Sequence, residues 1–311
     1  MNAINILFPV FFMLAIGYLC KSRGWVTADQ KEGAKKVVFQ ILFPILIFSI
    51  LFSSTVNPST FSLVIYVFVA FIIIYVIGRK LIFWTGNQFA HLSPFLLMTC
   101  EGGSVALPLY TSIVGTAYAS NTITFDIAGV LLGFVLIPIL VAKQTSAEVK
   151  PLMLVKKTIT NPFVLAVFLG LLLNLSGVYS WLEQSTFFAL YTQTISMSTG
   201  SLTGLLLFTI GFDFSLSSQT WKPLFKLSLL RIITSLGIIA GFFLLFPRLM
   251  ADPIYKIGVL IYFMCPTGFA TPLQLVPLHK NADDGIYSST FLSVYMIVTL
   301  IVFTLVVSFL I

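Results

Sequence analysis

Glu101 is the residue whose position points most directly to chemistry. It lies within a long apolar stretch and is followed by Gly102, Gly103 and Ser104. A carboxylate at the centre of a membrane span costs about 2.5–3.5 kcal/mol on insertion scales, so it is hydrated, protonated, paired or bound to an ion. We therefore expect Glu101 to bind a proton, a sodium ion or a polar solute. The alternative is a structural acid that accepts hydrogen bonds from backbone N–H groups freed by the two glycines.

A short motif beside Glu101 occurs twice. Ala106-Leu107-Pro108-Leu109 recurs as Ala270-Thr271-Pro272-Leu273. Proline and glycine interrupt helical hydrogen bonds, and broken helices are tolerated at membrane depth only where they are buried in protein or line a cavity. Matched breaks in two halves of a chain indicate the binding site of a secondary transporter. The predicted substrate- or ion-binding residues are Glu101, Gly102, Gly103, Ser104, Pro108, Asp126, Pro266, Thr267, Gly268, Pro272 and Gln274.

Three further charged residues lie in or near apolar stretches. Asp126 is near the start of one stretch, so it could either line the cavity or be hydrated or cap a helix. Asp213 is near the end of another and is expected at the cytoplasmic interface. Arg231 is five residues beyond Lys226, so we expect its side chain to reach the inner surface, with contact to an anionic substrate as the alternative.

The sequence gives little support for metal, disulfide or catalytic chemistry. Its three cysteines, Cys20, Cys100 and Cys265, form no disulfide framework and are expected to be small packing residues. His91 and His279 are isolated from other metal-ligating residues, so no metal site or cofactor is predicted. An intramembrane enzyme is disfavoured, because Gly-x-Gly-Asp and paired Asp-rich motifs are absent and no histidine is placed to pair with a serine.

Composition identifies the class of protein. Of the 311 residues, 58% are hydrophobic and 9% are charged, and the mean hydropathy is +1.04. Soluble domains carry about a quarter charged residues, so this pattern predicts an all-α membrane protein. The net charge of +7 is spread over separate loops rather than one patch, which argues against nucleic-acid binding.

Ten segments have the length and composition of membrane spans, which need about 20 mainly apolar residues. The fourth and ninth contain the two breaks. The seventh is the least secure, because the stretch Thr192–Thr203 is rich in Ser and Thr. The predicted spans are 4–20, 34–53, 61–80, 94–116, 121–142, 159–176, 185–211, 224–246, 256–278 and 285–310.

The basic residues predict the topology. Of 17 Lys and Arg residues, 14 fall in the odd-numbered loops, and the even loops hold only Arg248 and Lys256. Cytoplasmic loops are rich in Lys and Arg, so both termini are expected outside the cytoplasm. We expect a single transmembrane domain over residues 1–311.

The two halves of the chain resemble each other. Pro9, Gly17 and Gly24 match Pro162, Gly170 and Gly177 at a constant offset of 153, and Pro108 matches Pro272 at an offset of 164. Because each half holds five spans, the second half begins on the opposite side of the membrane. This predicts inverted repeats over 1–142 and 158–311, joined by a basic cytoplasmic loop over 143–157.

The sequence resembles the auxin efflux carrier family, which includes bacterial malate permeases. The resemblance covers essentially the whole chain. It lies in the stretches Ile16-Gly17-Tyr18, Arg23-Gly24, Leu42-Phe43-Pro44 with Phe48, Gly103 to Leu109, Asp126, and Cys265-Pro266 to Asp283.

The resemblance implies a fold and a mode of action. It implies ten spans in two inverted five-helix repeats, a scaffold part that forms homodimers, and a transport part whose broken, crossing helices four and nine hold an organic anion. Movement is expected to be of the elevator type. Glu101 replaces the usual Asn, and Ala106 stands where Gly is usual. An anionic substrate would therefore meet a second negative charge, unless Glu101 is protonated, a cation lies with it, or the substrate is not an anion.

Together these observations predict a secondary transporter of the cell membrane. It would move a small organic anion such as a carboxylate, coupled to a proton or sodium ion through Glu101. In the related sodium–bile acid symporters an acid at a crossover helps to bind sodium, which supports a cation here. The alternatives are a sodium-coupled symporter of another amphipathic or cationic solute, an intramembrane enzyme, and a channel or sensor.

Overall fold

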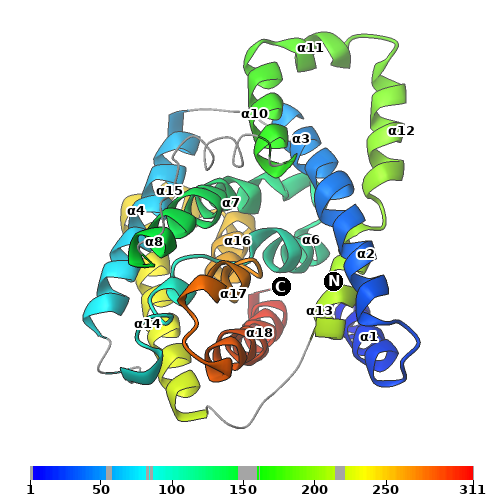
Figure 1. The fold of residues 1–311 in the computed structure, drawn as a ribbon. Coiled ribbons are helices and arrows are strands. Elements are labelled where there is room, and N and C mark those ends of the chain that lie inside the picture. Colours follow the sequence, from blue (N-terminus) through cyan, green and yellow to red (C-terminus); the bar gives the residue numbers. More distant parts are fainter. Residues whose placement is uncertain are drawn as a thin grey trace.

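The computed structural model describes residues 3–53, 58–81, 84, 87–145, 160, 162–213 and 221–310, and every regular element among them is a helix (Figure 1). Seven of these helices are long and apolar enough to cross a membrane, which indicates a membrane protein. They are Ile4–Ser22, Ala28–Ser53, Thr60–Lys80, Ser120–Gln144, Phe188–Asp213, Trp221–Leu245 and Ala282–Leu310.

The other three predicted spans are shorter or broken. The sixth overlaps α10 (Pro162–Leu175), and the fourth and ninth are interrupted. The fourth contains η3 (Phe95–Leu97), η4 (Gly102–Ala106) and α6 (Leu107–Val114), and the ninth contains α16 (Pro253–Phe263), α17 (Thr271–Gln274) and η7 (Val276–Leu278). Most of the predicted joining loop, residues 146–157, lies outside the described residues.

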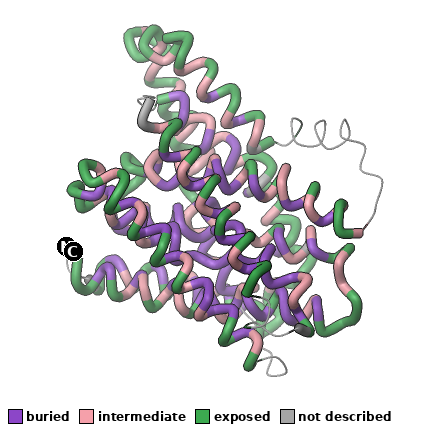
Figure 2. The backbone as a smooth tube through the Cα atoms, turned by 90° about the vertical axis from the view of Figure 1, so that its left-hand side faces the viewer, coloured by how far each residue is buried: buried purple, intermediate pink, exposed green. Residues whose placement is uncertain are grey.

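The helices form two groups. In the outer group α1 packs along α13 and α3 packs along α10, and α10 to α12 extend beyond the rest (Figure 1). In the inner group α4, α7, α14, α16 and α18 surround the interrupted segments and bury most of the core (Figure 2). The outer group is α1 (Ala3–Ser22), α2 (Ala28–Val37), η1 (Val38–Leu42), α3 (Phe43–Ser53), α10, α11 (Val178–Glu183), α12 (Phe188–Thr199) and α13 (Leu202–Asp213). The inner group is α4 (Pro58–Lys80), η2 (Asn87–Phe89), η3, η4, α6, η5 (Thr116–Tyr118), α7 (Ser120–Leu131), η6 (Leu132–Leu136), α8 (Ile137–Gln144), α14 (Trp221–Leu245), α15 (Pro247–Met250), α16, α17, η7 and α18 (Ala282–Leu310).

Two glycines allow α1 and α13 to approach closely. A Cβ atom added to Gly17 would overlap the carbonyl oxygen of Phe208, and one added to Gly211 would overlap the carbonyl oxygen of Leu14. Both obstacles are backbone atoms, which cannot rotate away as a side chain can. Small residues at helix interfaces are the usual means of such close packing in membranes.

We expect Gly17→Ala to destabilise the outer group, because the new methyl group must push α13 away from α1. Overpacking of this kind costs about 1–3 kcal/mol, which would lower the midpoint of thermal unfolding by several degrees. The matched control is Gly237→Ala in α14, where the added Cβ would meet no atom within 4 Å. Equal melting temperatures for the two variants in lipid nanodiscs would contradict this packing.

Three π-helical turns each lie just before a proline. The turns η1, η4 and η6 end two residues before Pro44, Pro108 and Pro138. Proline lacks an N–H and clashes with the carbonyl four residues earlier, and a wider turn relieves that clash. The helix therefore continues past each proline, but with a backbone carbonyl left without its helical donor.

Candidate functional site

The two predicted breaks exist, but they lie before the prolines rather than at them. The chain leaves helical geometry over 98–101 and again over 264–270. Pro108 and Pro272 instead lie in the first turns of α6 and α17. The expectation that Pro108 itself interrupts the helix is wrong, because the wider turn η4 relieves the clash of the proline ring and the helix continues from η4 into α6.

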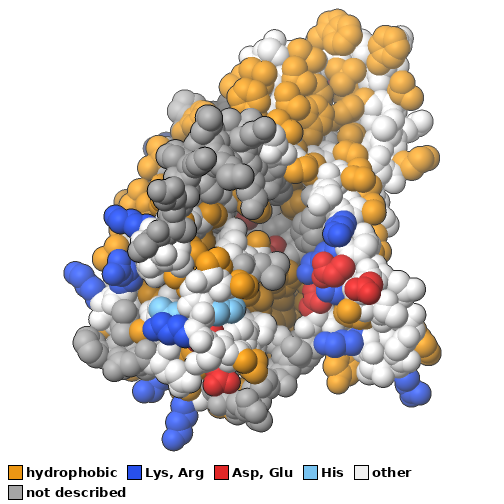
Figure 3. Space-filling view, in the orientation of Figure 1, with side chains coloured by type: hydrophobic (Ala, Val, Ile, Leu, Met, Phe, Trp, Pro, Cys, Tyr) orange, Lys and Arg blue, Asp and Glu red, His pale blue; other side chains and the backbone are white. Residues whose placement is uncertain are grey.

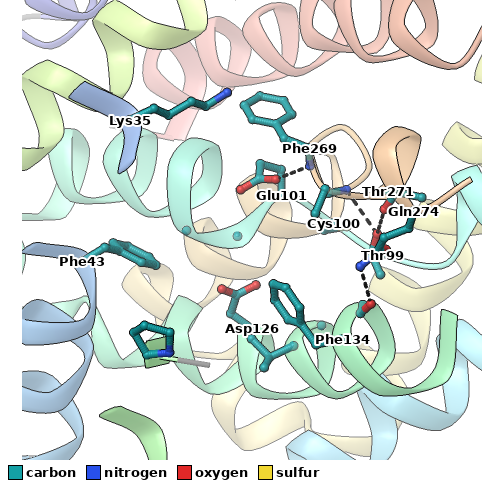
Figure 4. Close-up of a pocket in the computed structure, with 18 of the residues that line it drawn as sticks. Lys35, Phe43, Thr99, Cys100, Glu101, Asp126, Phe134, Phe269, Thr271 and Gln274 are labelled. Carbon is teal, nitrogen blue, oxygen red and sulfur yellow. Dashed lines mark hydrogen bonds between the residues drawn. The ribbon is translucent and has the colours of Figure 1, made fainter. Parts of the chain in front are cut away.

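The two breaks bond directly to each other. The Glu101 N–H donates to the Pro266 carbonyl oxygen at 2.7 Å. The Phe269 N–H donates to Glu101 Oε2 at 2.5 Å, as Figure 4 shows. Next to this pair, the Gly268 N–H donates to Thr99 Oγ1 at 3.1 Å. Each break thus supplies partners for backbone groups that the other leaves free, as a non-helical segment at membrane depth requires.

Glu101 also caps the half-helix that follows it. Its Oε1 atom accepts hydrogen bonds from the Ser104 N–H at 3.3 Å and from the Ser104 hydroxyl at 2.6 Å. A carboxylate at a helix N-terminus satisfies a free N–H and interacts favourably with the helix dipole. Glu101 therefore has the structural role that the sequence left open, as an acceptor for backbone N–H groups. Its side chain also lines the cavity.

A cavity of about 460 Å³ lies between the two helix groups. Figure 3 shows a hollow in this face of the molecule, with acidic and basic side chains along one edge over α2 and α13. Six of the predicted residues line the cavity: Glu101, Gly102, Gly103, Asp126, Gly268 and Gln274. Ser104 and Thr267 are fully buried, and Pro272 lines a second cavity of about 290 Å³.

Asp126 is a buried residue of this cavity and not a helix cap. It lies in the middle of α7, is only 8% exposed, and accepts a hydrogen bond from the Tyr262 hydroxyl at 3.1 Å. A Cβ atom added to Gly102 would overlap the Asp126 carboxylate, so this acid packs directly against the first break. Figure 4 shows its carboxylate directed toward the part of the site that holds Glu101.

All three π-helical turns contribute to the cavity wall, through Gln40, Gly102, Gly103, Gly133 and Phe134. Pro138 has no N–H to donate to the Gly133 carbonyl oxygen, and that oxygen accepts a hydrogen bond from Gln274 Nε2 at 2.8 Å. Gln274 therefore joins α17 to η6 and also lines the cavity. Turns of this kind are frequent at functional sites.

Several cavity residues were not predicted from the sequence. They are Glu32, Lys35, Lys36, Phe43, Phe134, Phe269 and Thr271. Lys35 forms an ion pair with Asp213 at 2.9 Å, and its Nζ atom lies 5.4 Å from the centre of the Phe269 ring. Asp213 also pairs with Lys31 at 2.7 Å, so it joins α13 to α2 at the cavity mouth. The only available signal is that Lys35 and Lys36 lie at the start of the second predicted span.

Arg231 does not reach a surface, and that prediction is wrong. Its side chain is 2% exposed, with Nη1 donating to the Leu96 carbonyl at 2.9 Å and Nη2 donating to the carbonyls of Thr99 at 2.7 Å and Cys265 at 2.9 Å. The ring of Tyr295 lies 4.9 Å from the guanidinium carbon. Carbonyls at the ends of interrupted helices carry partial negative charge, which explains how a buried cation is stabilised without an acid.

The guanidinium of Arg231 joins the two breaks on the side away from the cavity, since Arg231 is not among the cavity residues. It also lies 3.4 Å from Cys100 Sγ. Cys100 and Cys265 are both buried with free thiols, in keeping with their expected packing role.

Comparisons with known proteins do not assign this site to a family. No protein-family model matches the chain, and no curated protein matches its sequence.

Proposed function

We propose that this protein is a secondary transporter of the cell membrane that moves a small organic carboxylate together with a proton or cation. One observation carries the proposal: two broken helices, about 165 residues apart in the chain, bond to each other and wall a cavity that holds two carboxylates. Ionisable groups at membrane depth are costly, and where they occur they usually mark a pathway for ions or solutes.

Matching helix ends support the proposed inverted repeat. Gly24 follows α1 with φ 67°, and Gly177 follows α10 with φ 77°, each two residues after the last helical residue. Left-handed backbone of this kind favours glycine and ends helices. The two glycines are 153 residues apart, and so are the two helix ends.

Helix pairing supports the same proposal. Gly170 packs α10 against α3, where an added Cβ would lie 3.0 Å from the Phe48 carbonyl oxygen, and its counterpart Gly17 packs α1 against α13. In the proposed repeat α1 corresponds to α10 and α3 corresponds to α13, so the pair α10–α3 matches the pair α1–α13. In the same way, the contact of α4 with α7 corresponds to that of α14 with α18.

The position of the chain ends supports an even number of spans. The N- and C-terminal ends lie close together in both views (Figures 1 and 2). With the basic loops placed in the cytoplasm, the lysine-bearing mouth of the cavity opens toward the cytoplasm. An elevator would then carry the inner group past the outer group, and exposed apolar residues on α10 to α12, such as Phe168 and Trp181, would face lipid or a second copy of the chain.

The two carboxylates require a positive partner during transport. Glu101 and Asp126 line one cavity, and like charges that close together destabilise each other. A proton, a sodium ion or a positive group on the solute would relieve the repulsion. A transporter of a cationic solute is the second candidate, because the innermost charged residues of the cavity are both acids.

Glu101→Gln tests the coupling role. Glutamine keeps the size of the side chain and one acceptor oxygen but cannot bind a proton or balance a cation. We expect solute uptake into proteoliposomes to fall at least about tenfold and to lose its dependence on pH or sodium. The matched control, Glu183→Gln on exposed α11, should behave as wild type. Unchanged uptake with unchanged pH dependence would reject the coupling role.

A further inference from the structure

The anion-binding donors at the crossover are already occupied. A helix N-terminus beside a broken segment can hold the carboxylate of a solute through its free N–H groups. Here the N–H of Ser104 is bonded to Glu101 Oε1, and the N–H of Phe269 from the other break is bonded to Glu101 Oε2. The chain's own carboxylate thus takes the place that an anionic solute would need.

The charge left at this end of the cavity is negative. Glu101 and Asp126 both line the cavity, and within the described ranges neither forms an ion pair. Arg231, a buried cation, uses its Nη atoms on the carbonyls of Leu96, Thr99 and Cys265. Asp126 receives one hydrogen bond at Oδ1, from Tyr262, which leaves acceptor sites for a donor in the cavity. An ammonium group, with three N–H donors, matches this end.

The α2 side of the cavity carries two lysines. Lys35 and Lys36 line the cavity there. Lys36 makes no ion pair with a described residue, and Lys35 is shared between Asp213 and the Phe269 ring. Glu32 also lines this side but is paired with Lys31. A carboxylate on the solute would be favoured here and disfavoured beside Glu101.

Much of the remaining cavity wall is apolar. Val130 lines it together with Phe43, Phe134 and Phe269, which Figure 4 labels. A volume of about 460 Å³ lies within the range of small-molecule sites, which are mostly apolar with a few oriented polar groups. A solute that fits would carry charges of opposite sign and an apolar group.

We infer that the solute is a zwitterion of the apolar amino-acid class, with its ammonium group against Glu101 and Asp126 and its carboxylate toward Lys36 and Lys35. This inference rests on the proposed transport function and names its substrate class. It also identifies the positive partner of the two acids as part of the solute, so that no separate cation is needed for binding.

Thermal unfolding of the full chain in lipid nanodiscs, in sodium-free potassium buffer at pH 7, tests the inference. The probes are leucine, isoleucine, valine, methionine, phenylalanine, tyrosine and tryptophan, each compared with the acid that lacks its amino group and the amine that lacks its carboxyl group. We expect at least one amino acid to raise the melting temperature by about 3 °C or more, and by more than either counterpart. If no amino acid exceeds both of its counterparts, the inference is wrong.

The outcome also separates this inference from the proposed function. A shift by the acids alone, or by the amines alone, would overturn the zwitterion and leave transport intact, with an anionic or cationic solute. Failure of every amino acid, acid and amine to exchange across proteoliposomes would instead overturn the proposed function.

Charge-neutralising variants test the orientation of the solute. Asp126→Asn keeps an acceptor for Tyr262 and, unlike Glu101→Gln, leaves the η4 cap untouched. We expect each of these variants to weaken amino-acid binding at least about tenfold without weakening binding of the acid that lacks the amino group. Lys36→Gln should weaken binding of the amino acid and not of the amine. Asp283→Asn and Lys226→Gln, both at exposed positions, are the matched controls. Unchanged amino-acid affinity in Asp126→Asn would contradict the placement of the ammonium group.

Discussion

Arg231→Ala will lower the stability of the protein by about 3 kcal/mol or more. The substitution removes the donors of the Leu96, Thr99 and Cys265 carbonyls in one step and leaves them buried. Each unsatisfied buried group costs about 1–3 kcal/mol, and lipid offers no water to replace the lost donor. Because the carbonyls of Thr99 and Cys265 belong to the two breaks, the two broken segments should separate as the protein loosens.

Melting temperatures in nanodiscs measure this effect. Arg248→Ala, which removes an arginine from an exposed position on α15, is the matched control and should stay near wild type. Arg231→Lys keeps the charge but has no planar fork of donors, so its melting temperature should lie between those of Arg231→Ala and Arg248→Ala. Arg231→Ala with the melting temperature of Arg248→Ala would contradict a structural role for the guanidinium.

Gly102→Ala will reduce transport at least about tenfold. An added Cβ would overlap the Asp126 carboxylate and lie 2.8 Å from Cε2 of the Tyr262 ring. Both neighbours are buried and hydrogen-bonded to each other, so neither can move without breaking that contact. The added methyl group would therefore displace the first break or the Asp126 side chain, and overpacking of this kind costs about 1–3 kcal/mol.

Gly133→Ala is the matched comparison for this substitution. Gly133 lines the same cavity, but its added Cβ would meet no atom within 4 Å. Initial uptake rates at saturating and low solute separate the two variants, and we expect the loss in Gly102→Ala to greatly exceed that in Gly133→Ala. Equal losses would show that any added methyl group impairs the cavity, and that the contact of Gly102 with Asp126 has no special importance.

Much of the helix layout could be predicted because hydrophobic length and glycine placement are local signals. The weak seventh span is divided into α12 and α13, where Gly200 and Ser201 separate them. Gly17 lies at a close helix crossing, as does Gly170. These features follow from a few neighbouring residues. The count of ten spans and the inverted repeat remain predictions, because seven helices among the described residues have the length of a full span.

The site could be predicted only in part, because its contacts join distant segments. Glu101 was recognised from its cost in an apolar stretch, but its bond to the Phe269 N–H links positions 168 residues apart. Arg231 was misplaced because an arginine near a span end usually reaches water, and nothing in the sequence shows three carbonyls arranged around it. The sequence alone indicates that Lys35 is a loop charge, but α2 continues into the second span and carries this lysine into the cavity.

The breaks were assigned to the prolines because proline disrupts a helix interior. In the structure the wider turn η4 comes just before Pro108, so the helix tolerates the proline. The irregular backbone lies earlier in the chain, over 98–101. Predicting this would require knowing which residues begin each half-helix. That choice depends on the Glu101 cap and on bonds to the other break, and so on tertiary structure.

Counterflow in proteoliposomes tests the central claim most directly. Vesicles are loaded with an unlabelled solute chosen as the one that most raises the melting temperature, and the labelled form is added outside in trace amounts. The transporter account predicts transient, saturable accumulation of label that is strongly reduced in Gly102→Ala and retained in Gly237→Ala. Label that is chemically converted, that enters without saturation, or that accumulates equally in Gly102→Ala would contradict a transport site at the crossover.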